Sequence, residues 1–161
     1  MSYQIADEPV ESSLRDYAVH PHAPMLAMMV CGAWLAWPWF AFNAFAIGSP
    51  TRRTELALCG ATFGATFALA GVVLVLFRHG VIPDGVPLRL ALLAITTCKL
   101  ALGYWLVAVQ ERTFHVYAYY GGRVRDARRV LAVGWLIRGF VIGLVDHPLW
   151  VIVVSGGLGS P

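Results

Sequence analysis

The chain has 161 residues and a formal net charge of +3, with 58% hydrophobic and only 13% charged residues. A soluble domain carries roughly 25% charged residues, and a small one cannot bury this much apolar surface. The composition therefore excludes an ordinary soluble domain, gives no support for a nucleic-acid partner, and predicts a membrane protein. Its eleven arginines and single lysine are typical of a GC-rich bacterium, so we expect the cell inner (cytoplasmic) membrane.

Four apolar stretches follow one another along the chain, at 25–47, 56–77, 90–110 and 130–154. About 20 apolar residues in a helix span the hydrocarbon core, and helices satisfy their own backbone groups in lipid. The pattern predicts an all-α, multi-pass membrane protein, with residues 1–161 forming a single membrane domain. Four transmembrane helices would form a compact bundle preceded by an N-terminal tail at 1–24. The sequence Asp146-His147-Pro148 leaves open whether the fourth span ends early.

The distribution of basic residues predicts an orientation. The connections around 51–55 and 111–129 carry seven arginines, against three in the tails and the 78–89 connection. Because cytoplasmic loops carry the excess of Arg and Lys, both termini are expected on the outer, periplasmic side. In the basic 111–129 connection, four arginines form a cluster that would either hold anionic lipid headgroups or only set the topology: Arg123, Arg125, Arg128 and Arg129.

Glycines at a spacing of four residues mark two of the predicted spans. Gly60 and Gly64 recur in the second span, and Gly139 and Gly143 in the fourth. Small residues allow close backbone approach, which drives helix association in lipid. We expect these glycines at the tightest helix contacts, either within the chain or with another subunit.

Lys99 and Arg138 lie inside predicted spans, where a charge needs a partner. One interpretation pairs Lys99 with Asp146 and lets Arg138 extend to the cytoplasmic surface. The other gives the surplus positive charge to an acid of a partner subunit or to an anionic ligand. Glu55 and Glu111 are expected at the surface.

Histidine and methionine residues gather on the predicted outer side. The candidate metal ligands are His20, His22, Met25, His79 and His147. Imidazole with thioether suits copper, and two of the histidines would also suit a haem. Ordinary interfacial histidines preceding a helix remain the alternative.

No motif in the sequence indicates catalysis, so an enzyme is not favoured. The leading hypothesis is a non-catalytic accessory, assembly or scaffold subunit of a larger inner-membrane protein complex, with lipids and other membrane subunits as partners. A copper- or haem-binding membrane protein is the second hypothesis, and a small oligomeric anion or lipid-headgroup carrier is the third. The sequence leaves homo- and hetero-oligomer open.

Overall fold

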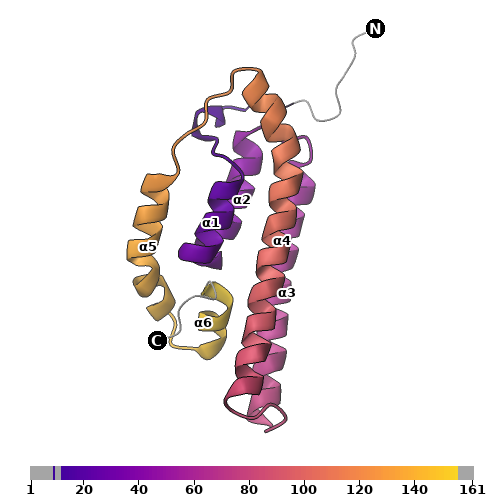
Figure 1. Ribbon diagram of the computed structural model, residues 1–161, viewed down its shortest axis with the longest axis vertical. Helices are drawn as coiled ribbons and strands as arrows, with labels where there is room; N and C mark the ends of the chain where they lie inside the picture. The colour runs from indigo at the N-terminus through magenta and orange to yellow at the C-terminus, as the bar shows by residue number, and fades with distance from the viewer. Residues whose placement is uncertain (1–8, 10–11, 156–161) are drawn as a thin grey trace.

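The computed structural model describes residue 9 and residues 12–155 (Figure 1). The regular elements in these residues are all helical, which confirms the all-α prediction. They are a 3-10 turn, η1 (Arg15–Tyr17), and six α-helices: α1 (His22–Val30), α2 (Ala33–Ala46), α3 (Arg52–Arg78), α4 (Val86–Tyr119), α5 (Arg128–Gly143) and α6 (Pro148–Val154).

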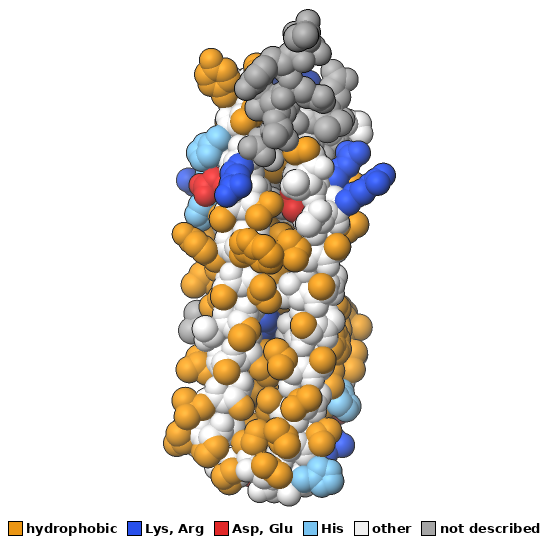
Figure 2. All heavy atoms as spheres, turned by 90° about the vertical axis from the view of Figure 1, so that its right-hand side faces the viewer, with side chains coloured by type: hydrophobic (Ala, Val, Ile, Leu, Met, Phe, Trp, Pro, Cys, Tyr) orange, Lys and Arg blue, Asp and Glu red, His pale blue; other side chains and the backbone are white. Residues whose placement is uncertain are grey.

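Helices α3 and α4 form a long antiparallel pair along one side of the molecule (Figure 1). They have 27 and 34 residues, so they are about 40 and 50 Å long, and both are long and apolar enough to cross a membrane. Only 22% and 28% of their most apolar stretches are buried. Hydrophobic side chains cover the visible face over most of its length, and charged groups gather near the upper end (Figure 2).

The predicted span 25–47 is a helical hairpin and not one helix. Gly32 separates α1 from α2 with a φ of 111°, which L-residues rarely adopt, so the chain reverses there. As a result, Ala18 packs beside Ala46 and Ile47, and the Val19 amide donates to Asn43 Oδ1 at 3.0 Å. The hairpin enters and leaves at the same end of the molecule, with its tip at mid-length (Figure 1).

The predicted span 130–154 is also broken. Helix α5 ends at Gly143, and α6 begins at Pro148 after an extended His147, because a residue before proline is disfavoured in the helical conformation. Helix α6 then runs back beside α5, with Trp150 Nε1 donating to the Val141 carbonyl at 3.0 Å. The early end of the helix, left open by the sequence, is therefore observed, and a count of four spanning helices is not confirmed.

The described N-terminal residues lie at the same end as the basic connection. The Arg125 amide donates to the Ala18 carbonyl at 2.8 Å, and the Tyr117 hydroxyl lies 2.7 Å from the Arg15 carbonyl oxygen. The expected placement of this tail opposite the connection is therefore wrong. We call this the basic end, because it carries eight arginines: Arg15, Arg52, Arg53, Arg112, Arg123, Arg125, Arg128 and Arg129. The far end, formed by the α3–α4 connection, carries two, Arg78 and Arg89 (Figure 1).

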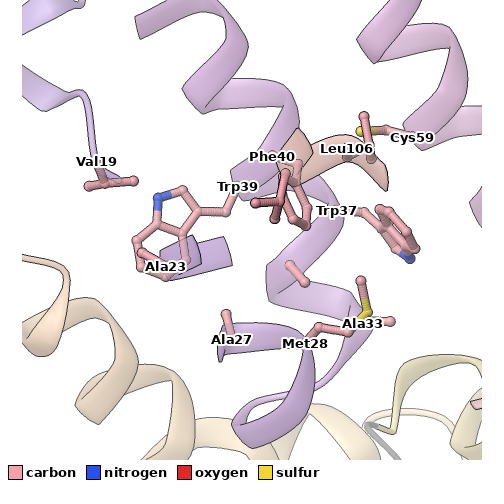
Figure 3. Packing of buried hydrophobic residues seen from close by; sticks show 12 residues of the cluster. Val19, Ala23, Ala27, Met28, Ala33, Trp37, Trp39, Phe40, Cys59 and Leu106 are labelled. Carbon is pink, nitrogen blue, oxygen red and sulfur yellow. The ribbon is translucent and has the colours of Figure 1, made fainter. Parts of the chain in front are cut away.

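The core lies around the hairpin in the half of the molecule nearer the basic end. Side chains from the hairpin meet Cys59 of α3 and Leu106 of α4 around Phe40 (Figure 3). Trp37 and Trp39 are buried in this cluster, so these rings fill space within the chain. Helix α5 stands apart, and Gly134 is its single buried residue.

Candidate functional site

Lys99 binds the carboxyl end of α6. Its Nζ lies 3.1, 3.3 and 2.8 Å from the carbonyl oxygens of Ile152, Val153 and Ser155. The last carbonyls of a helix have no partner within it, and the helix dipole makes this end attractive to a cation. Lys99 is only 3% exposed, so α6 ends in a buried position with its carbonyls satisfied.

This contact replaces the proposed Lys99–Asp146 bridge. Asp146 is exposed in the α5–α6 connection, and the ion pairs of the described residues do not include it. Residues 130–154 do not form one straight helix, so the helical spacing from Arg138 to Asp146 does not place Asp146 near Lys99. Lys99 is therefore enclosed and directed at three carbonyl oxygens.

Arg138 makes a similar contact at the hairpin tip. Its Nη1 donates to the carbonyl of Val30, the last residue of α1, at 3.2 Å. The other guanidinium protons have no acidic partner among the described residues, whose two ion pairs are His115–Glu111 and Arg128–Asp126. Part of the hydrogen-bonding capacity of Arg138 therefore stays free.

The four predicted packing glycines face open space in the chain. A Cβ placed on Gly60, Gly64, Gly139 or Gly143 would meet no atom within 4 Å. Close intrachain contacts occur at other glycines, among them Gly134 of α5, where a Cβ would lie 2.5 Å from Leu35 Cδ2 and 3.0 Å from Cys31 Sγ. The glycines on α3 and α5 thus leave backbone exposed along two apolar helices.

An apolar groove lies next to the glycines of α3. Its volume is about 460 Å³, and it runs between α2, α3 and α6. The lining residues are Trp34, Trp37, Pro38, Ala41, Leu56, Cys59, Gly60, Phe63, Trp150 and Val154. Gly60 therefore lines the groove and also forms, with Gly64, an exposed pair of glycines on α3 that we call the glycine row.

A buried polar network joins α2, α3 and α4 near the basic end. Glu55, expected at the surface, is fully buried, and it accepts hydrogen bonds from Ser49, from Thr51 Oγ1 at 2.8 Å and from Gln110 Nε2 at 2.9 Å. Gln110 also donates to the Phe40 carbonyl at 2.9 Å and accepts from Asn43 Nδ2 at 3.1 Å. Sequence reasoning missed this network, although Asn43 and Gln110 are isolated amides within apolar runs.

The arginine cluster of the basic connection is exposed. Arg125 lies over the Tyr17 ring with 4.7 Å from Cζ to the ring centroid, and Arg128 Nε lies 3.8 Å from Asp126 Oδ1. Arg123 and Arg129 are exposed as well, so headgroup binding by the cluster stays a prediction.

The candidate metal ligands fall into separate groups. His20 and His22 lie at the basic end, with 3.1 Å between their Nδ1 atoms, and Glu111 joins them. His79 lies at the far end, because it follows Glu55 by 24 residues, about 36 Å along α3, and His147 lies in the α5–α6 connection. Met25 Sδ packs against Gly103. The expected convergence of all five residues, as a copper or haem site, is therefore wrong.

His20 is held by its neighbours at this site. Its ring packs edge-on against the buried Phe114 ring with 4.8 Å between centroids. Partial burial lowers the pKa of the His20 imidazole, and the neighbouring His22 lowers it further, while Glu111 opposes the shift. His20 therefore favours the neutral form, which is the form that binds a metal.

Comparison with known proteins gives no relative: no family model, curated protein or solved structure matches this chain.

Proposed function

We propose that this chain is a non-catalytic accessory or assembly subunit of a larger protein complex in the cytoplasmic membrane of a bacterium. In this proposal α3 and α4 cross the bilayer, and the basic end faces the cytoplasm. The eight-to-two distribution of arginines between the two ends supports that orientation. The α1–α2 hairpin then enters from the cytoplasmic side and returns to it.

The uncovered glycine row of α3 is the observation that carries the proposal. Gly60 and Gly64 face open space although they lie in an apolar helix, and Gly60 opens into the groove between α2, α3 and α6. Helix association in lipid depends on small residues that let two backbones approach. A transmembrane helix of another subunit is therefore the expected occupant of this face.

Arg138 supports a partner on the α5 side. Arg138 has no acidic partner in the part of the chain that the structure describes, and the uncovered Gly139 directly follows it. A charge in the apolar layer is stabilised by an acid or by polar groups, which a neighbouring subunit supplies in this proposal.

Native mass spectrometry of the protein extracted gently from its own membranes tests the proposal. Additional protein chains at fixed stoichiometry are expected with the wild type and are lost in the Gly60→Leu/Gly64→Leu variant. A matched control is Ala94→Leu/Ala101→Leu, which places the same side chains at two exposed positions of α4. A monomer or a homo-oligomer alone in the wild type contradicts the accessory-subunit proposal.

A further inference from the structure

The fold brings together imidazole and carboxylate groups that are about 90 residues apart in the chain. His20 and His22 come from the segment that leads into α1, and Glu111 comes from α4. One ligand atom from each residue lies within 4.8 Å of the other two. His115, one helical turn after Glu111, places its Nε2 3.8 Å from Glu111 Oε1.

We infer that His20, His22 and Glu111 form a three-residue binding site for a divalent transition-metal ion of the zinc type, with the fourth coordination position open. Neutral imidazoles with one carboxylate are a usual donor set for zinc. The methionine of the copper hypothesis is not part of it, since Met25 packs against Gly103.

The spacing of the three side chains is close to that of a zinc site. Zinc lies about 2.1 Å from nitrogen and oxygen ligands, which places neighbouring ligand atoms about 3.4 Å apart. The Nδ1 atoms of His20 and His22 are hydrogen-bonded to each other at 3.1 Å, and the His22 amide donates to His20 Nδ1 at 3.3 Å. A bound ion would replace these hydrogen bonds and draw in Glu111, whose carboxylate lies within 4.8 Å of both rings. Phe114 holds the His20 ring, and α4 holds Glu111 and His115 on one face.

A bound ion would connect the start of the α1–α2 hairpin to α4. These segments already touch through His20 and Phe114 and through the Tyr117 hydroxyl at the Arg15 carbonyl. The metal therefore stabilises the entry of the hairpin at the basic end, which is a role separate from the glycine face of α3.

The test is a zinc titration of the full chain, purified in detergent with a tag free of histidine, against a chromophoric competing chelator. The wild type is expected to bind one equivalent of Zn²⁺. His20→Gln/His22→Gln is expected to weaken binding by at least about 100-fold and Glu111→Gln by at least about 10-fold, because loss of even an outer-shell partner costs about 10- to 100-fold.

Two histidines away from the site, His79 after α3 and His147 before α6, provide the matched control. His79→Gln/His147→Gln removes the same number of imidazoles, and its affinity is expected to equal that of the wild type. The site is overturned if the wild type binds no zinc beyond the His20→Gln/His22→Gln variant, or if the control loses as much affinity. Zinc-edge X-ray absorption is expected to show only nitrogen and oxygen ligands, and a sulfur ligand also overturns the assignment.

Discussion

The Lys99 ammonium nitrogen lies 2.8 Å from the carbonyl oxygen of Ser155, just beyond the end of α6. Arg138 makes the equivalent contact with Val30 at the end of α1. Both short helices end beside apolar neighbours, where unpaired carbonyls are costly. Both charges inside the predicted spans therefore cap helix ends, and the three contacts of Lys99 explain why it needs no acid within the chain.

Replacement of Lys99 by methionine should destabilise α6 docking. The three carbonyls that Lys99 contacts lose their partner, and an unsatisfied buried polar group costs about 1–3 kcal/mol. We expect a loss of about 3 kcal/mol in the free energy of unfolding, measured by denaturation in detergent micelles. Asp146→Asn is the control, and it should have no effect. An equal loss of stability in both variants would indicate that Lys99 and Asp146 form an ion pair after all.

Replacement of Gln110 by leucine should break the buried polar network. The change leaves Glu55 with one fewer donor and Asn43 without its acceptor. We expect a loss of about 2–4 kcal/mol, since a partly satisfied network retains buried groups that water cannot reach. Thr97→Val removes an exposed hydroxyl that bonds only within its own helix, and it should change stability by less than about 0.5 kcal/mol. A Gln110→Leu protein as stable as Thr97→Val would contradict the network.

Two glycines of α5 should respond oppositely to leucine. At Gly134 the new side chain collides with Leu35 and Cys31, and overpacking of this kind costs about 1–3 kcal/mol. At Gly139 it meets open space, so stability should be unchanged or raised by the better helix propensity of leucine. Thermal unfolding of the two purified variants in detergent compares them directly. A lower stability of Gly139→Leu alone would show that α5 is rotated from its described position.

Labelling from one side of the membrane should reveal the hairpin topology. The variants Ser13→Cys and Val124→Cys introduce a cysteine at the basic end, whereas Asp84→Cys introduces one in the α3–α4 connection at the far end. A membrane-impermeant maleimide applied to oriented vesicles should label positions 13 and 124 from the same side and position 84 from the other. Labelling of positions 13 and 84 from the same side would contradict the hairpin and indicate that residues 25–47 cross the membrane as one helix.

The sequence predicted the two long helices well and the two broken ones poorly. Hydropathy is sufficient to predict α3 and α4 as long helices, because the chain makes no turn within their apolar runs. The reversal at Gly32 depends on a backbone conformation that hydropathy does not record, although a glycine is the residue that permits it. The Asp146-His147-Pro148 break was visible in the sequence, but the return of α6 towards Lys99 was not.

The candidate site was predicted in its residues more than in its arrangement. Lys99, Arg138 and the four glycines were identified from residue type and spacing, since a charge in an apolar helix is rare and spaced small residues mark helix contacts. The groups that Lys99 and Arg138 contact depend on where the chain reverses direction, before α2 and before α6, and tertiary packing determines those reversals. Glu111 was missed as a companion of His20 for the same reason, because a straight first span would place the two at opposite ends.

Photo-crosslinking in intact membranes tests the central claim most directly. A photoreactive amino acid at position 64 of α3 would project from the glycine face, and the same amino acid at position 94 of α4 would project from an exposed face without glycines. The account predicts a defined adduct with another membrane protein from position 64 and none from position 94. Adducts with lipid only at position 64, or equal protein adducts at both positions, would contradict it.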